Sequence, residues 1–245
     1  MSILWYIFTM KKLVLGATGA IGSALAKKIV SDGEEVHLVA RDEASLSTFA
    51  SELNSTFTTC DVLEDGFSEK ILSDLADTPI NGLAYCVGSI DLKPLKLSKK
   101  KDFLECFNLN LISATEIIRA SFEKLKENKG AIVLFSTVAA RKGFTNHSII
   151  SSAKAAVEGL TVALAAEFSP NVRVNCIAPS LSKSKMGEFL LKNEKIAEGI
   201  AKLHPLKRLG NGSDFSAIAK FLLSEESSWM TGQIIGVDGG RSAIA

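Results

Sequence analysis

The sequence predicts an α/β fold, a Rossmann-type doubly wound sheet of seven parallel strands with helices on both faces. Three observations lead to this prediction. Apolar runs of strand length alternate with longer stretches of helical period, and the first run leads through a glycine-rich turn into a helix. Most of the runs are also continuously apolar, as expected when helices cover both faces of a parallel sheet.

Seven apolar runs are predicted to be the strands of this sheet. In chain order they are Lys12–Leu15, Val36–Ala40, Thr56–Cys60, Gly82–Val87, Ala131–Ser136, Arg173–Ala178 and Ile234–Val237. Between the first two, Ala20–Ser31 places apolar side chains on one helical face, and Gly33 can supply the left-handed residue that ends the helix. The two longest helices are predicted at Lys101–Asn128 and Asn146–Phe168.

The composition is that of an ordinary globular protein. Apolar residues make up 47% of the chain and charged residues 22%. The 28 basic and 27 acidic side chains leave a formal charge of +1, so we expect no nucleic-acid partner. No linker, repeat or low-complexity segment interrupts residues 1–245, which are therefore predicted to form a single domain.

The cysteines and the first residues bear on the compartment. Cys60, Cys86, Cys106 and Cys176 form no C-x-x-C pair and have no histidine at ligand spacing, so we expect no metal site, no disulfide and a cytoplasmic location. Residues 1–9 are apolar but too short to span a bilayer, and they run directly into the first strand. They are predicted to be an N-terminal extension; a membrane anchor is the less favoured interpretation.

The segment Gly16–Gly22 follows the first strand and opens the first helix, with glycine at its first, fourth and seventh positions. Residues without a Cβ let backbone N–H groups approach a pyrophosphate, and the helix N-terminus adds partial positive charge. Such a turn can be purely structural, but its strand–turn–helix context favours dinucleotide binding. The predicted cofactor contacts in this turn are Gly16, Thr18, Gly19, Ala20 and Ile21.

The end of the second predicted strand indicates which dinucleotide is bound. Sites for NAD(H) place an acidic side chain near this point to accept from the ribose hydroxyls, whereas Ala40 and Arg41 stand here. The Arg41 guanidinium can pair with a 2′-phosphate and stack on adenine, so the predicted cofactor is NADP(H), with NAD(H) less favoured. A solvated Arg41, followed by Asp42 as the N-cap of the next helix, is the alternative.

Further motifs follow in a fixed order along the chain. They are Asp61-Val62, Gly88, Asn110, Lys154, Pro179-Ser180, Ser184 and Val237-Asp238-Gly239-Gly240. Together with the glycine turn, they resemble the short-chain dehydrogenase/reductase family over essentially the whole chain. The resemblance implies further cofactor contacts at Asp61, Val62, Gly88, Lys154, Pro179, Ser180 and Ser184. The chain departs from the family at the turn, which is usually T-G-x-x-x-G-x-G, and at Tyr85–Gly88, which stands where N-N-A-G is usual.

The resemblance implies an active site that this sequence matches only in part. Asn110 corresponds to the asparagine that holds a proton-relay water, and Lys154 to the lysine that binds the nicotinamide ribose. The tyrosine of the family's Y-x-x-x-K motif would fall on Ile150, and neither Tyr6 nor Tyr85 can take its place by sequence position. Because isoleucine has no proton to give to a developing alkoxide, we expect an atypical proton donor.

Two registers offer different residues for this chemistry. Enoyl-acyl carrier protein reductases of the superfamily place their tyrosine seven residues before the lysine, where this chain has His147, an imidazole able to donate a proton near neutral pH. A surface histidine at a helix start is the alternative interpretation. Thr137 takes the place of the catalytic serine in the usual register and Ser136 in the enoyl-reductase one, although either hydroxyl can simply cap the strand end. The candidate catalytic residues are Asn110, Ser136, Thr137, His147 and Lys154.

These residues support an NADP(H)-dependent oxidoreductase that acts on a carbonyl, alcohol or conjugated alkene. A non-catalytic NADP(H)-binding or redox-sensing protein is the alternative, and a sugar-nucleotide epimerase, favoured by the glycine spacing alone, is a third. Residues 181–203 are expected to form a substrate lid whose apolar face suits an apolar small molecule, although core packing explains the same pattern. The resemblance also implies a homodimer or homotetramer built on the two long helices.

Overall fold

The structure is a computed structural model that describes residues 10–183 and 193–244. Its centre is a seven-stranded parallel sheet with the strand order β3-β2-β1-β4-β5-β6-β7. The strands are β1 (Lys11–Leu15), β2 (Glu35–Ala40), β3 (Thr56–Thr59), β4 (Ile80–Tyr85), β5 (Ala131–Phe135), β6 (Arg173–Pro179) and β7 (Ile234–Val237). The predicted fold class is confirmed, and each strand lies within two residues of its predicted bounds.

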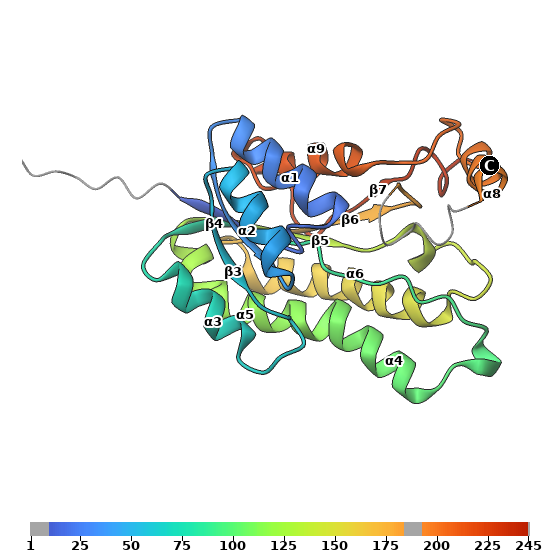
Figure 1. Cartoon of the computed structure of the whole chain (residues 1–245), viewed down its shortest axis with the longest axis horizontal. Coiled ribbons are helices and arrows are strands. Elements are labelled where there is room, and N and C mark those ends of the chain that lie inside the picture. Colours follow the sequence, from blue (N-terminus) through green and yellow to red (C-terminus); the bar gives the residue numbers. More distant parts are fainter. Residues whose placement is uncertain (1–9, 184–192, 245) are drawn as a thin grey trace, which may run out of the picture.

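Helices cover both faces of the sheet (Figure 1). The α-helices are α1 (Ala20–Ser31), α2 (Glu43–Glu52), α3 (Phe67–Leu75), α4 (Lys100–Phe107), α5 (Ser113–Glu127), α6 (Ser148–Phe168), α8 (Glu194–Lys202) and α9 (Gly212–Leu222). Short helical turns are η1 (Leu95–Leu97), η2 (Asn108–Ile112), η3 (Val138–Ala140) and η5 (Glu225–Ser227). The predicted first helix has the bounds of α1, and the predicted Asn146–Phe168 helix begins two residues later, at Ser148.

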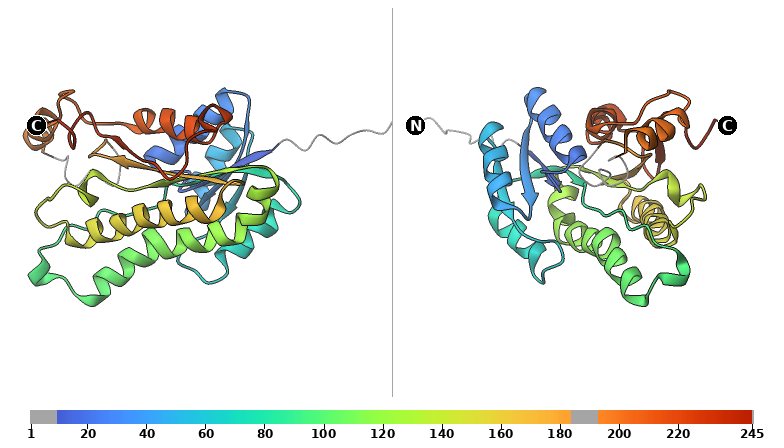
Figure 2. Two further views of the ribbon diagram at one scale, coloured as in Figure 1. Left: turned by 180° about the vertical axis from the view of Figure 1, so that it is seen from behind. Right: turned by 45° about the vertical axis from the view of Figure 1, so that its right-hand side comes forward.

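Each face of the sheet has its own apolar core. Leu13 and Leu15 of β1 contribute to the core under α3, α5 and α6, whereas Val14 contributes to the core under α1, α2 and α9. This division follows from the period of two along a strand, which sends successive side chains to opposite faces. The two helical layers are visible above and below the sheet in Figure 1 and again in Figure 2. Both faces are buried at the central strands, which explains why those strands are continuously apolar, whereas the edge strand β3 is partly exposed.

The helix predicted over Lys101–Asn128 is interrupted in the structure. It is divided into α4, the π-helical turn η2 and α5. Within η2 the Asn110 side chain donates from Nδ2 to the Cys106 carbonyl at 2.9 Å, and the Ser113 hydroxyl donates to the Asn108 carbonyl at 2.9 Å. Side chains therefore donate hydrogen bonds to backbone carbonyls near the interruption. Single π-helical turns of this kind are frequent at functional sites.

The carboxyl ends of the strands define one edge of the molecule. Leu15 at the end of β1 lies between Val39 of β2 and Tyr85 of β4. The strand order reverses at β1, and a reversal of this kind predicts a ligand-binding crevice outside the carboxyl ends. In Figure 1 this edge faces α8 and the C-terminal end. Among the described helices, α6 alone is long and apolar enough to cross a membrane, and here it packs against β6 and η3.

Candidate active site

The glycine turn connects β1 to α1 at this edge. Gly16 has a φ of +74°, and its N–H and that of Ala17 donate to the Val39 carbonyl at 2.9 and 3.0 Å. A Cβ on Gly22 would collide with the Gly16 carbonyl oxygen, so this position requires glycine. Gly19 is the N-cap of α1 without a side-chain cap, and the first turn of α1 holds no acidic residue. The uncapped N–H groups fit the pyrophosphate of a dinucleotide.

Arg41 and Asp61 meet where β2 and β3 end. Arg41 Nη1 lies 3.9 Å from Asp61 Oδ2, and the Arg41 side chain is 81% exposed. Asp61 Oδ1 also accepts from the Leu63 N–H at 3.0 Å, which fixes the carboxylate, and Val62 beside it is buried. The predicted cap is present, since Asp42 Oδ1 accepts from the Ser45 N–H at 2.8 Å. The structure therefore brings one exposed cation and one hydrogen-bonded carboxylate together where β2 and β3 end.

Gly88, Asn110 and Lys154 converge at the other end of the crevice. A Cβ built on Gly88 would lie 2.9 Å from Asn110 Oδ1 and 3.2 Å from Lys154 Nζ, so the backbone at Gly88 approaches both side chains closely. Asn110 is buried, and its Oδ1 has no hydrogen-bond partner in the described part of the chain. A buried carbonyl oxygen of this kind normally binds a water or a ligand group.

Lys154 is the cation of this cluster, and its pKa is strongly lowered. Lys154 is only 7% exposed, and its Nζ donates to the Phe135 carbonyl at 2.8 Å. Burial lowers the pKa of Lys154 to about 8, because the ammonium is kept from water, and no ion pair to Lys154 is found among the described residues. The same burial raises the pKa of the Cys86 thiol to about 12, so that thiol stays protonated.

Ser136 and Thr137 end β5 but are bonded differently. Buried Ser136 lies with Oγ 2.9 Å from Glu158 Oε1 and 3.2 Å from the Lys154 carbonyl, so its single proton is directed to acceptors within the protein. Thr137 Oγ1 accepts from the Ala139 N–H at 3.3 Å and caps η3. A hydroxyl that accepts this bond still has its own proton to donate.

His147 and Ile150 lie at the start of α6 in different surroundings. His147 Nδ1 donates to the Thr145 carbonyl at 2.7 Å, and its ring centre is 5.3 Å from that of Phe144. Ile150 is 4% exposed and lies in an apolar cluster with Cys106, Ile149 and Ala153. His147 borders a cleft of about 380 Å³ whose lining does not include Lys154 or Asn110.

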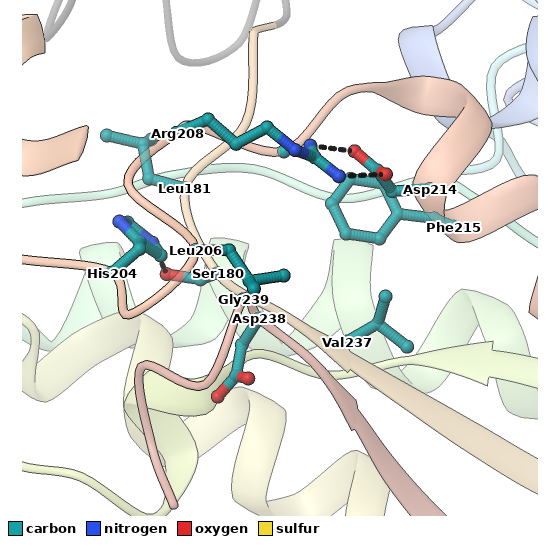
Figure 3. A pocket seen from close by; sticks show the side chains of 11 residues that line it. Ser180, Leu181, His204, Leu206, Arg208, Asp214, Phe215, Val237, Asp238 and Gly239 are labelled. Carbon is teal, nitrogen blue, oxygen red and sulfur yellow. Dashed lines mark hydrogen bonds and ion pairs between the residues drawn. The ribbon is translucent and has the colours of Figure 1, made fainter. Parts of the chain in front are cut away.

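Pro179 is the last residue of β6. Ser180, which follows it, lines a smaller cavity of about 150 Å³ (Figure 3). The Ser180 hydroxyl donates to Nε2 of buried His204 at 2.8 Å, and His204 Nδ1 donates to the Ile200 carbonyl at 2.9 Å. Arg208 and Asp214, which also line this cavity, form two bonds of 2.7 Å with each other. Sequence reasoning missed His204, because no spacing links it to Ser180, 24 residues earlier.

Sequence reasoning also missed Glu158 and Arg141. Glu158 Oε2 accepts from Arg141 Nε at 2.7 Å, so Ser136, Glu158 and Arg141 form one chain of hydrogen bonds. A signal for Glu158 was present, since it follows Lys154 by four residues and so shares its helix face. Arg141 lies in an irregular loop and had no such signal.

Some predicted features lie outside the described residues. These are Ser184, the extension at residues 1–9 and residues 184–192 of the expected lid. The described part of the lid includes α8, where Ile196 is exposed. Within the ranges that the structure describes, no group of three or more histidine, cysteine, aspartate or glutamate side chains is arranged to hold a metal ion.

Comparison with known proteins gives consistent matches over nearly the whole chain. A family model described as enoyl-(acyl carrier protein) reductase matches residues 16–242. A chloroplastic tropinone reductase homolog from Arabidopsis thaliana is 33% identical over 97% of this chain and 77% of its own length, and L-xylulose reductase from Bos taurus is 29% identical over 94% and 95%. A solved structure described as a short chain dehydrogenase/reductase family protein superimposes with a TM-score of 0.87 at 27% identity, covering 96% of this chain and 97% of its own.

Proposed function

This chain belongs to the short-chain dehydrogenase/reductase family, and on that premise we propose that it is an NADP(H)-dependent oxidoreductase with an atypical proton donor. Proteins of this family bind nicotinamide cofactors and act on small molecules that carry a carbonyl or an alcohol. Conjugated alkenes are a further substrate class in the proposal. The observation that carries it is the convergence of Gly88, Asn110 and Lys154 at the crevice.

The preference for the 2′-phosphorylated cofactor rests on Arg41. Its guanidinium is exposed at the end of β2, and its nearest carboxylate is 3.9 Å away, so a phosphate dianion can compete for it. The Gly16–Gly22 turn would hold the pyrophosphate, and Asp61 and Val62 the adenine end. When bound, the nicotinamide supplies the hydride, and the protein supplies binding, orientation and the proton.

We assign the proton to Lys154 acting with Asn110. A pKa near 8 makes the Lys154 ammonium a ready proton donor near neutral pH. Asn110 Oδ1 is a buried acceptor close to the same point, and it would hold a water that carries the proton from Nζ to the substrate oxygen. Ile150 is buried in an apolar cluster and has no proton to transfer.

Thr137 is the proposed donor that orients the substrate oxygen. Its hydroxyl proton is not committed to a partner among the described residues, whereas that of Ser136 is directed toward Glu158 or the Lys154 carbonyl. Ser136 is accordingly a positioning residue that holds the carboxyl end of β5 against α6. His147 remains the alternative proton donor; it lies seven residues, about 10 Å along the helix axis, from Lys154.

The remaining parts of the proposal concern the whole protein. We propose a single domain, a lid over residues 181–203, a cytoplasmic location and a homodimer or homotetramer. The proposed substrate is a small molecule, and apolar character is compatible with exposed Ile196 on α8.

The second candidate function is non-catalytic NADP(H) binding, and the burial of Ile150 in an apolar cluster is the observation that favours it. A protein of this kind needs no proton donor. It has, however, no evident use for a buried lysine beside an unpartnered asparagine oxygen, since burying a charge without a partner destabilises the fold.

Two measurements test the proposal. Thermal unfolding with NADPH and with NADH at equal concentrations is expected to give the larger stabilisation with NADPH, and an equal effect would contradict the role of Arg41. Loss of NADPH absorbance is then followed with a panel of ketones, aldehydes and conjugated enones. Turnover of one compound class supports the oxidoreductase, whereas tight NADPH binding without turnover of any class supports the non-catalytic function.

A further inference from the structure

A cationic cleft lies beside the start of α6, outside the Gly88–Asn110–Lys154 cluster. Its volume is about 380 Å³, and the loop from η3 to α6 forms most of its wall. The ionisable side chains that line it are Arg141, Lys142 and His147, all of them basic. No aspartate or glutamate belongs to its described lining. In Figure 1 the loop between β5 and α6 lies at the same edge of the molecule as α8.

The positive charge of this cleft is only partly neutralised. Lys142 Nζ donates to the Arg241 backbone carbonyl at 2.9 Å and has no carboxylate within ion-pair distance among the described residues. Arg141 is paired with Glu158 through Nε, but its side chain is 58% exposed and its two terminal nitrogens make no hydrogen bond in the described ranges. Arg241 adds a further cation, with its guanidinium 5.6 Å from the Phe144 ring centre.

The backbone at this point favours an anion as well. His147 is the N-cap of α6 but makes no side-chain cap, and no acidic residue stands in the first turn of this 21-residue helix. The first N–H groups of a helix have no partner inside it and carry partial positive charge. Ser148 Oγ, in that first turn, has no partner in the part of the chain that the structure describes.

The cleft is close to the proposed point of reaction. Ser151 lines it, and Lys154 follows three residues later on the same helix face, one turn or about 5 Å along the axis. Ala139 and Ala140, which also line the cleft, belong to η3, whose N-cap is Thr137. The cleft and Thr137 therefore belong to one short stretch of chain at the end of β5.

We propose that this cleft binds an anionic group, a carboxylate or a phosphate, on the substrate itself. The substrate class is then a small oxo- or hydroxy-acid, or the phosphate ester of a small carbonyl compound. The basic side chains and the α6 N-terminus hold the anion while the carbonyl carbon faces the reaction centre. This assignment deepens the proposed function and rests on it for the identity of the reacting group.

The test measures anion binding without turnover. The full chain, saturated with NADPH, is titrated with inorganic phosphate and separately with acetate, each against chloride at equal ionic strength, while the backbone amide NMR shifts are followed. We expect saturable shifts confined to Gly143, His147, Ser148 and Ile149. Lys142→Gln is expected to raise the Kd roughly three- to tenfold, because one charge-assisted contact is lost. Lys101→Gln, which removes an exposed lysine from α4, is the matched control and should leave the Kd unchanged.

The outcomes separate this inference from the proposed function. A response to phosphate alone or to acetate alone supports the cleft and identifies its anion. No shift at these residues, or an equal Kd in the wild type and Lys142→Gln, overturns the inference. If NADPH does not bind, the titration is repeated on the free protein, where the same shifts are expected, since the cleft is formed without the cofactor. Failure of NADPH binding thus counts against the proposed function alone.

Discussion

The two ends of the crevice differ in how closely they follow the chemistry that their sequence motifs imply. At the β1–α1–β2 end, the turn has the left-handed glycine, the close approach and the uncapped helix N-terminus that a pyrophosphate needs. At the α6 end, Lys154 and Asn110 converge, but an apolar cluster surrounds position 150. Cofactor binding depends on backbone geometry, whereas proton transfer depends on single side chains. A fold can therefore keep the first while it changes the second.

The largest expected effect is at the α6 end. Lys154→Met is expected to lower NADPH-dependent turnover about 10²- to 10⁴-fold, because it removes the proposed proton donor. Initial rates with a substrate from the carbonyl panel measure it, together with NADPH affinity by calorimetry. Lys101→Gln serves as the control for loss of a distant lysine. A Lys154→Met protein that binds NADPH and turns over at the wild-type rate would contradict the assignment.

The second prediction concerns the pH dependence of folding stability. The pKa of Lys154 is lowered to about 8 by burial, against an ordinary value of 10.5. Below pH 8 both the folded and unfolded states are protonated, so the burial penalty is fully present. Between pH 8 and pH 10.5 the folded state loses the Lys154 proton before the unfolded state does, and the free energy of unfolding therefore rises with pH. Measured by urea unfolding relative to Lys154→Met, the free energy of unfolding of the cofactor-free wild type should rise by about 3 kcal/mol over this range. A constant difference across the range would show that Lys154 is not buried as a cation.

A third prediction sharpens the contrast at position 150. Ile150→Tyr is expected to destabilise the protein by about 1–3 kcal/mol, because a larger side chain with a polar hydroxyl enters a packed apolar cluster. Ile196→Tyr, at an exposed position on α8, should change the stability little. Chemical denaturation measures both. If Ile150→Tyr is as stable as the wild type, the cluster has room for a phenol, and the two ends of the crevice differ less than proposed.

The smallest effect is expected at the β2 end. Arg41→Ala should weaken NADPH binding roughly tenfold and leave NADH binding nearly unchanged, because one exposed charge-assisted contact to the 2′-phosphate is lost. Arg119→Ala, which removes an exposed arginine from α5, is the control. Calorimetric titration with both cofactors decides the point. An equal loss of affinity for NADPH and NADH would contradict the proposal, because Arg41 would then contact a group that both cofactors share and not the 2′-phosphate.

The positions of the strands could be predicted from the sequence more fully than the contacts of the candidate site. Strands and the turn depend on local patterns, and the continuous apolar runs and the glycine spacing predict β1 through β7 to within two residues. The break at η2 was not predicted, because no proline or glycine stands between Lys101 and Asn128 to indicate an interruption of the helix.

The hydrogen bonds that join Ser136, Glu158 and Arg141 could not be predicted from the sequence either. Ser136 and Glu158 are 22 residues apart and meet only because α6 packs against the end of β5. That contact changes how the two candidate hydroxyls are interpreted, since it directs the Ser136 proton away from a substrate and leaves Thr137 as the donor. Residue type and spacing do not reveal such a difference, because both residues fit one of the two registers.

The pH dependence of carbonyl reduction tests the central claim most directly. We predict that kcat/KM for NADPH-dependent reduction is constant at low pH and falls about tenfold per unit above a pKa near 8, as the Lys154 ammonium loses its proton. His147→Gln should keep that profile. A fall that is abolished in His147→Gln would contradict the account, because the proton would then come from the imidazole.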